Sequence, residues 1–341
     1  MILTNDNPRY QYLERGRKTM NSELKIREET FISTEILELQ NEAKQHLANS
    51  KAENTKRAYR SDWTQFSEWC EKNKLQDLPA ETETLVYYLT FLGKTQKASS
   101  IKRKMTAISQ RHETAGYPSP TQTALVKGVW EGLQRSIGIK EEGKEALWLD
   151  ELRQIIQAID QTTLIGVRNR ALLVIGWAGA LRRSELVGLN SEDISKTRDG
   201  LILHLNRSKT DQKGEGQEIA LPYGSNPLTC PVRSLEDWLA TSEISEGPLF
   251  RRIDRHGNIL GRLTPQSVRL VVRKSCEAVG MDSERYGAHS LRSGFCSTAA
   301  KAGKAEHQIM KQTRHKRSDS LQRYIKKANL FDDNAANGIG L

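Results

Sequence analysis

Hydrophobic periodicity constrains the fold of this chain more than any other feature of its sequence. From Ser33 to about Gly138, apolar side chains recur with the period of an α-helix. In the clearest run they follow at i, i+4, i+7 and i+11, which places them on one helix face that must be buried against other helices. That run is Tyr59, Trp63, Phe66 and Cys70, and two further helices are indicated by Leu85, Leu89 and Leu92 and by Ile101, Met105 and Ile108.

Short polar signals mark where helices are expected to begin. Ser50 with Glu53 predicts a capping box, and Ser119 before Pro120 predicts an N-cap with proline at the first helical position. Asp150 is expected to cap a later helix. The inward face of that helix would carry Leu152, Ile155, Ile156 and Ile159. The sequence therefore predicts a bundle of four or five helices over residues 33–138, preceded by a polar, flexible arm, residues 1–32.

The hydrophobic period changes in the second half of the chain. Residues 139–146 are charged, contain glycine and have no period, which is typical of a linker. Beyond them, the turn signal Asp199-Gly200 precedes an apolar run, Leu201–Leu205, which suits a buried strand paired with Gln217–Leu221. Further helical patterns lie at residues 168–178, 265–279, 290–302, 305–313 and 321–325. We therefore expect a mainly α fold, with the N-terminal bundle followed by a larger α+β domain, residues 147–341, that holds a small antiparallel sheet.

The charge of the chain favours a polyanion as its partner. Lys and Arg number 52 against 42 Asp and Glu, a formal net charge of +10 at pH 7. Charge alone leaves DNA, RNA and a membrane face open. The longest apolar run, Ala171–Ala180, is much shorter than the roughly 20 residues that cross a bilayer, and the N-terminus lacks the pattern of a secretory signal. We therefore expect a protein inside the cell, with no membrane partner.

The cysteines give no sign of a metal site or of a disulfide framework. Four are present, far apart and without a Cys-x-x-Cys pair: Cys70, Cys230, Cys276 and Cys296. We expect reduced, mostly buried thiols.

Four polar motifs follow one another in the second domain. The first, Gly179-Ala-Leu-Arg182-Arg-Ser-Glu185-Leu, is a glycine turn into a short helix that places Arg182 and Glu185 on one face. The second, Arg207-Ser-Lys209-Thr-Asp211, lies in the hairpin loop. The third is His289-Ser-Leu-Arg292, and the fourth is Arg314-His315, followed by Tyr324. Each motif alone has little meaning, because arginines at helix ends and lysines in loops are ordinary surface residues.

Taken together, in this order and spacing, the motifs resemble the active site of the tyrosine recombinases, the family of Cre and lambda integrase. The resemblance extends from about Ser33 to Leu330. It implies that the N-terminal bundle is a core-binding domain and that the second domain is catalytic. The activity it implies is site-specific recombination, in which DNA strands are cleaved and rejoined through a 3′-phosphotyrosine intermediate.

The chemistry of a phosphodiester explains why these residue types are needed. Two guanidiniums, here Arg182 and Arg292, can bind both non-bridging oxygens and stabilise the charge of the transition state. Tyr324 would be the nucleophile and His289 would assist removal of its proton. Lys209, on a loop, would protonate the departing 5′ oxygen.

Two further residues complete the expected site. His315 would donate a hydrogen bond to a phosphate oxygen, and Glu185 would brace the histidines or Arg182. The competing interpretation of Tyr324 is a core aromatic beside Leu321 and Ile325.

The resemblance also implies which cofactors and partners to expect. The family needs neither ATP nor a metal, and the sequence contains no Gly-x-x-x-x-Gly-Lys-Ser/Thr loop and no His-Glu-x-x-His helix. The partner would be double-stranded DNA with inverted-repeat sites, bound by a homotetramer that exchanges strands through a Holliday junction, with a monomer when free. The tail after Tyr324 would dock on a neighbouring subunit, with Leu330 and Phe331 as its anchors. A prokaryotic, phage or mobile-element setting follows from the same resemblance.

Basic residues of the bundle are candidate phosphate contacts, although runs of this kind are often only solvated helix faces. These candidates are Lys51, Lys56, Arg57, Arg60, Lys102, Arg103 and Lys104.

Three other functions compete with recombination. A type IB topoisomerase shares the chemistry but relaxes any supercoiled DNA as a monomer. A DNA-binding regulator could keep the fold without the reaction, although the complete set of motif residues counts against it. An RNA-binding protein is the least favoured, because no aromatic stacking platform is evident.

Overall fold

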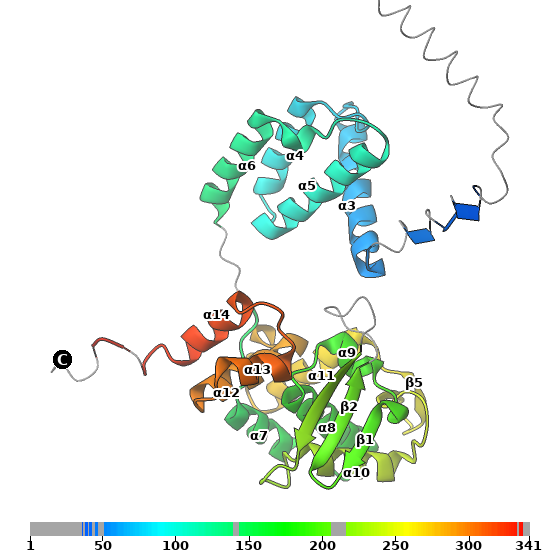
Figure 1. Ribbon diagram of the computed structural model, residues 1–341, viewed down its shortest axis with the longest axis vertical. Helices are drawn as coiled ribbons and strands as arrows, with labels where there is room; N and C mark the ends of the chain where they lie inside the picture. Colours follow the sequence, from blue (N-terminus) through cyan, green and yellow to red (C-terminus); the bar gives the residue numbers. More distant parts are fainter. Residues whose placement is uncertain are drawn as a thin grey trace, which may run out of the picture. The chain divides into compact units, whose positions relative to one another are not determined.

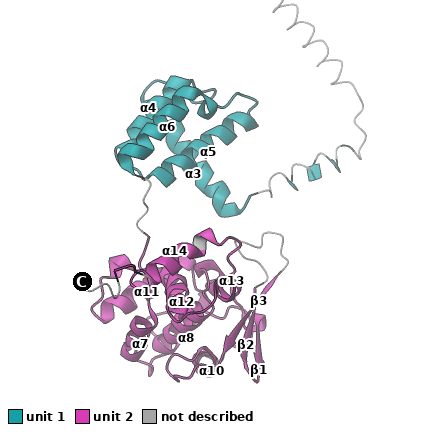
Figure 2. Cartoon of the chain, turned by 60° about the vertical axis from the view of Figure 1, so that its left-hand side comes forward, with its two compact units in different colours: residues 1–141 teal, residues 142–341 magenta. Residues whose placement is uncertain are grey.

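The computed structural model describes residues 51–138, 143–205, 216–332 and 334–336, together with residues 36, 38–39, 41–42 and 45–46 (Figure 1). The chain divides into two compact units, Met1–Glu141 and Glu142–Leu341 (Figure 2). The division lies inside residues 139–146, where a linker is expected, and the assignment of residues to domains stays a prediction. The expected arm, residues 1–32, and Lys209 lie outside the described residues.

The first unit is a bundle of helices: α3 (Glu53–Lys72), α4 (Thr82–Gly93), α5 (Ala98–Thr114), the short 3-10 helix η1 (Pro120–Gln122) and α6 (Ala124–Ile137). Helix α3 packs on α5, and α4 packs on α6. The predicted apolar faces supply the core, which includes Phe66, Cys70, Leu85, Leu89, Ile101 and Ile108. The helical expectation for this part of the chain is therefore confirmed.

Two expected helix caps are wrong. Helix α3 begins at Glu53 with Ala52 at the N-cap, so Glu53 is the first helical residue and cannot close a box with Ser50 three residues before it. Helix α7 (Leu149–Ala158) has Trp148 at its N-cap, and the Glu151 carboxylate accepts the Trp148 backbone N–H at 2.8 Å. Asp150 therefore lies within the first turn instead of capping it.

His112 is a polar residue of the bundle core. Its ring is fully buried, and its Nε2 accepts the backbone N–H of Ala80 at 2.8 Å. Its Nδ1 lies 2.9 Å from the Ile108 carbonyl oxygen. The Ala80 amide is thereby satisfied inside the unit, which makes His112 a structural residue.

The second unit packs helices against the buried face of a small sheet. Strands β1 (Ile194–Thr197), β2 (Gly200–Leu205) and β3 (Gln217–Pro222) form an antiparallel sheet in that order. Leu203 of β2 pairs with Ile219 of β3, so the alternating leucines of β2 share one buried face with Ile219 and Leu221. The predicted hairpin is confirmed, and β1 and a second hairpin, β4 (Arg251–Ile253) with β5 (Ile259–Arg262), are additional.

The helices of this unit are α7, α8 (Leu164–Ala178), α9 (Arg183–Gly188), α10 (Pro231–Ser242), α11 (Pro265–Ala278), α12 (Ala288–Lys301), α13 (Glu306–Thr313) and α14 (Asp319–Ala328), with the short η2 (Ser191–Asp193) and η3 (Ser283–Arg285). Buried α8 lies at the centre, where α10 and α12 pack against it (Figure 1). The sequence did not indicate α10. The fold is mainly helical with small antiparallel sheets, as expected.

The described residues contain no helix with the length and apolar character that a membrane crossing requires. All four cysteines are buried and free, as expected.

Candidate active site

Arg182 and Glu185 are joined by the turn from α8 into α9. Arg182 is the N-cap residue of α9, and the Glu185 carboxylate accepts both its backbone N–H, at 2.8 Å, and its Nη1, at 2.6 Å. The Glu185 side chain is 1% exposed and that of Arg182 is 20% exposed. Glu185 therefore holds Arg182 from the interior while the Arg182 side chain stays partly exposed.

Glu185 stays ionised despite its burial. Burial by itself raises the pKa of this carboxyl, but the charge of Arg314 and the hydrogen bonds and charge of Arg182 outweigh burial and hold the pKa below its ordinary value. A negative charge between two guanidiniums is the result.

His289 and Arg292 lie one turn apart on α12. Nε2 of His289 lies 2.9 Å from the hydroxyl of Tyr324, which is carried by α14. Burial lowers the pKa of His289, and the charges of Arg292, Arg182 and Arg323 lower it further. The imidazole is therefore neutral near pH 7, and with its proton on Nδ1 it accepts the Tyr324 O–H.

Arg292 is almost completely buried, at 2% exposure. Its Nη1 donates to the Ala180 carbonyl oxygen at 2.7 Å, and its Nη2 donates to the carbonyl oxygen of Thr313. Burial, with the charges of Arg182 and Arg314, lowers its pKa to about 10, so it remains a cation at neutral pH. Each terminal nitrogen carries two hydrogens, so donors remain beyond these two carbonyls.

His315 follows the end of α13 and is fixed by Thr313. Its Nδ1 lies 2.7 Å from the Thr313 hydroxyl, which also lies 2.7 Å from the Ile309 carbonyl oxygen. Burial and the charges of Arg292 and Arg182 lower the pKa of His315 to about 4. The ring is therefore neutral in the free protein.

Arg314 is a third guanidinium in the same place, and the sequence assigned it no role. Its side chain is 4% exposed and pairs with Glu185 at 2.8 Å. The signal that was available is its position within the fourth motif, directly before His315.

The structure brings most of the expected site residues together. Arg182, Glu185, His289, Arg292, His315 and Tyr324 are linked by the contacts above and by their electrostatic effects on one another. Lys209 lies in the β2–β3 loop, outside the described residues. Tyr324 meets both interpretations of its role: its ring packs against the cluster that contains Leu321, and its hydroxyl faces His289.

The expected DNA-contact residues of the bundle differ in their exposure and in whether they already have a side-chain partner. Arg57, Arg60 and Lys102 are exposed. Nζ of Lys51 lies 5.4 Å from the centre of the Tyr59 ring, and Lys56 pairs with Glu53 at 3.2 Å.

The expectation that Lys104 contacts a phosphate is wrong. Its side chain is 3% exposed, and its Nζ pairs with Asp62 at 3.2 Å and with Gln65 at 2.6 Å. Arg103 is exposed but donates two hydrogen bonds to Asp62, at 2.7 and 3.0 Å. Because its ammonium is already held by the Asp62 carboxylate and the Gln65 side chain, Lys104 belongs to the join between α3 and α5.

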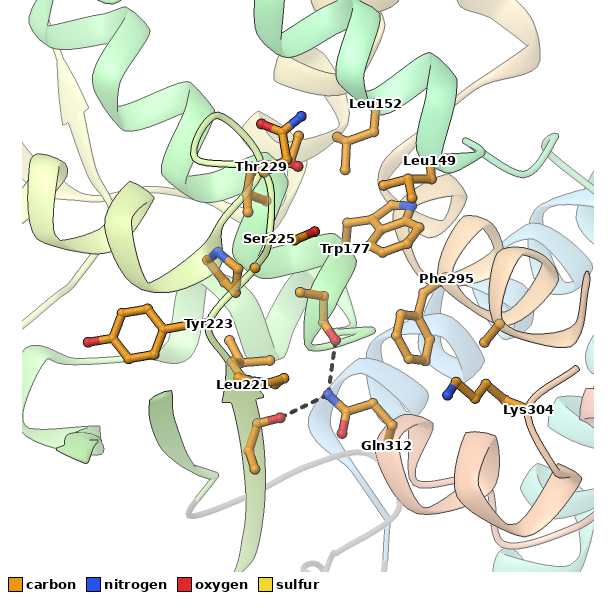
Figure 3. A pocket seen from close by; sticks show the side chains of 18 of the residues that line it. Leu149, Leu152, Trp177, Leu221, Tyr223, Ser225, Thr229, Phe295, Lys304 and Gln312 are labelled. Atoms are coloured by element: carbon orange, nitrogen blue, oxygen red, sulfur yellow. Dashed lines mark hydrogen bonds between the residues drawn. The ribbon is translucent and has the colours of Figure 1, made fainter. Parts of the chain in front are cut away.

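Two of the hollows in the described part of the second unit lie near the candidate site residues. The larger, about 500 Å³, is mainly apolar and contains Leu149, Trp177, Leu221 and Phe295 (Figure 3). At its edge Gln312 donates to the carbonyl oxygens of Ala178, at 2.9 Å, and Ala220, at 3.2 Å. The smaller, about 310 Å³, is lined by Gln217, Glu218, Met310, Lys311, Arg314, His315 and Lys316, and so opens beside the candidate active site.

Comparison with known proteins agrees with this geometry. The model of the phage integrase family matches residues 145–330. The chain is 40% identical over 299 residues to an integrase/recombinase XerD homolog of Selenomonas ruminantium, a match that covers 86% of this chain and 88% of the relative. It is 27% identical over 267 residues to the Cre recombinase of Escherichia phage P1, covering 72% and 76% of the two chains. The fold is similar to that of a lambda integrase dimer bound to a core site, with a TM-score of 0.57, 18% identity and coverage of 84% of this chain and 75% of that one.

Proposed function

The chain belongs to the phage integrase family and is a tyrosine-type site-specific recombinase, and from this premise we propose how its residues cut and rejoin DNA. We propose that Tyr324 attacks a phosphate of double-stranded DNA, forms a bond to the 3′ phosphate and releases a 5′ hydroxyl. The observation that carries the proposal is the 2.9 Å contact between the Tyr324 hydroxyl and the neutral His289. The pair of Tyr324 and His289 lies beside a group of guanidiniums that can bind an anionic phosphate.

In the first step the phenol oxygen forms a bond to phosphorus. Its proton passes to Nε2 of His289, and the bond between phosphorus and the 5′ oxygen breaks. Lys209 supplies a proton to that departing oxygen. Rejoining runs these transfers in reverse, with the 5′ hydroxyl of the exchanged strand as nucleophile. Because the phosphotyrosine conserves the bond energy, no ATP or metal takes part in the proposal.

Arg182 and Arg292 stabilise the negative charge that grows on the non-bridging oxygens. The partial exposure of the Arg182 side chain and the remaining donors of Arg292 support this role. Because Glu185 and the backbone carbonyls already hold both guanidiniums, little reorganisation is needed when DNA arrives.

His315 donates a hydrogen bond from Nε2 to a phosphate oxygen. For a neutral ring this requires the Thr313 hydroxyl to donate to Nδ1, which moves the ring proton to Nε2. The same hydroxyl can otherwise donate to the Ile309 carbonyl oxygen, 2.7 Å away. An arriving phosphate favours the first arrangement, because its oxygen accepts the Nε2 proton.

The active assembly that we propose is a homotetramer on two inverted-repeat sites, which exchanges strands through a Holliday junction. Leu330 and Phe331 are 62% and 78% exposed, so most of each side chain is accessible to a neighbouring subunit. We propose that these side chains enter the 500 Å³ apolar hollow of a neighbouring copy (Figure 3). The ion pair between Lys301 and Asp332, at 2.5 Å, would hold the start of the tail. The setting is a prokaryotic, phage or mobile-element genome.

The test is to trap the protein covalently on DNA from its host and to sequence the attached fragments. We expect adducts at one defined sequence with inverted repeats, and none with Tyr324→Phe. Adducts spread over unrelated sequences, with plasmid relaxation by monomers, would instead indicate a type IB topoisomerase. Site binding without any adduct would indicate a regulator.

A further inference from the structure

Arg314 has a backbone conformation that is unusual for a residue with a side chain. It caps the end of α13 at φ 58° and ψ 40°, in the left-handed region. Glycine is the usual residue there, since a Cβ atom is too close to the following carbonyl oxygen in that conformation. A long cationic side chain at such a position suggests that the side chain contributes something that glycine cannot.

The Arg314 guanidinium lies inside the protein and uses both of its terminal nitrogens. Nη1 donates to the carbonyl oxygens of Gly179, at 3.1 Å, and Gln312, at 2.8 Å. Nη2 donates to the carbonyl oxygen of Ala180, at 3.2 Å, and to the Glu185 carboxylate, at 2.8 Å. We call these contacts the Arg314 clasp. They join the turn at residues 179–180, the carboxylate of α9 and the turn at residues 312–315.

Each part of the clasp also holds a residue of the proposed mechanism. The Ala180 carbonyl oxygen accepts from Arg292 as well, at 2.7 Å. Glu185 holds Arg182 through its backbone and its guanidinium. His315 follows Arg314 directly in the chain. Arg314 is therefore connected to both phosphate-binding arginines and to His315, although its own side chain is 4% exposed.

The charge of Arg314 also determines how much of the Arg182 charge is available to DNA. Glu185 is buried and ionised, and among the described residues it forms ion pairs with Arg182 and Arg314. With both present, the carboxylate is shared. Without Arg314, the buried carboxylate would lose one of these two ion-pair partners, and the Arg182 guanidinium would be drawn inward, away from a phosphate.

We propose that Arg314 is a positioning residue for strand cleavage, which acts through Glu185 and Arg182 and does not touch the DNA. The inference rests on the phosphate-binding role proposed for Arg182. It predicts a loss of cleavage rate at saturating DNA, with site affinity nearly unchanged.

The principal variant is Arg314→Gly, which removes the clasp and relieves the left-handed backbone. The matched control is Arg198→Ala, because Arg198 also contributes one positive charge to this unit and its side chain is 93% exposed. Single-turnover cleavage of a DNA site is measured with site affinity and thermal unfolding. We expect Arg314→Gly to cleave about 100-fold more slowly, with affinity within about threefold of the unaltered protein. Arg198→Ala should cleave at the normal rate.

Dependence on Arg182 separates positioning from a general loss of structure. In an Arg182→Ala background, adding Arg314→Gly should slow cleavage by no more than about threefold, because the residue through which it acts is gone. Independent, multiplicative losses would overturn the proposal, as would a single variant that cleaves within about threefold of the unaltered protein.

Should Arg314→Gly unfold, Arg314→Lys carries the same test, because it keeps the charge but cannot bridge four acceptors. We expect Arg314→Lys to cleave about tenfold or more slowly than the unaltered protein, and we expect this effect to be absent in the Arg182→Ala background. Failure of the proposed function itself would be distinguishable, because adduct formation would then persist in Tyr324→Phe.

Discussion

Tyr324 combines a packed ring with a hydroxyl directed at a base, 2.9 Å from His289 Nε2. We expect Tyr324→Phe to form no covalent DNA adduct, because only the nucleophilic oxygen is removed. Site affinity should stay within about threefold, since the ring and its packing are kept. Denaturing gels for the adduct and gel shifts for binding measure the two effects. A persistent adduct would place the nucleophile elsewhere.

Lys209 and Arg292 are assigned different tasks, and one substrate separates them. Lys209→Ala should slow cleavage about 100-fold or more, yet a substrate with sulfur at the 5′ bridging position should be cut well, because a thiolate leaves without a proton. Arg292→Ala should stay slow on both substrates, because its proposed task is charge stabilisation. Equal behaviour of the two variants would contradict the proton-donor role of Lys209.

The histidines of the site make stability depend on pH. Burial and nearby arginines lower the pKa of His289, and they lower that of His315 to about 4. In the unfolded chain both histidines have the ordinary histidine pKa of about 6.5. Below that pH the unfolded chain therefore binds more protons than the folded protein. Stability should therefore fall as pH decreases from about 6.5 to about 4.

Urea unfolding across that pH range measures this effect. His315→Gln should make the dependence shallower. His307→Gln, at an exposed histidine, is the matched control and should leave it unchanged. A slope that His315→Gln does not alter would contradict the assignment.

At the scale of elements, the join between α3 and α5 depends on one buried carboxylate. Asp62 is 1% exposed and binds Arg103 and Lys104 of the facing helix. Burial raises the pKa of Asp62, but these two cations outweigh it and lower the pKa overall. Asp62→Asn would leave the Lys104 charge buried without its anion, so we expect a loss of about 3 kcal/mol in the free energy of unfolding.

Lys102→Ala is the contrasting variant on α5, because Lys102 is exposed. Its stability should change by less than about 0.5 kcal/mol, while its DNA affinity should fall and the salt dependence should decrease by about one unit of slope. Urea unfolding and binding at several salt concentrations distinguish the two helix faces. An Asp62→Asn protein of unchanged stability would mean that the ion pair does not hold the helices together.

For the whole molecule, the tail after α14 is expected to act between copies. A protein truncated after Lys327, or one carrying Leu330→Ala with Phe331→Ala, should bind a single site as a monomer. Each should lose cooperative assembly on paired sites, because the exposed anchors are gone. Gel shifts at fixed salt with one-site and two-site DNA measure both properties. Full synapsis by either protein would count against docking between subunits.

The sequence by itself determined most of the helical pattern and the β2–β3 pair, and it supplied the candidate site residues. The spacing of apolar residues follows directly from which face of a helix or strand is buried. The buried faces of the bundle helices and the pairing of β2 with β3 could therefore be predicted. The order of Arg182, His289, Arg292, His315 and Tyr324 was enough to resemble a family because those residue types perform one reaction.

Only the tertiary structure decided which polar side chains are buried, and with which partner. Lys104 meets Asp62 from a helix 42 positions away in the chain, and Arg314 meets Glu185 across 129 positions. The sequence pattern does not distinguish a long cationic side chain that faces solvent from one that pairs with a buried carboxylate. The difference is a balance between the cost of removing charge from water and the gain from a well-placed partner, and that partner is present only in the folded chain.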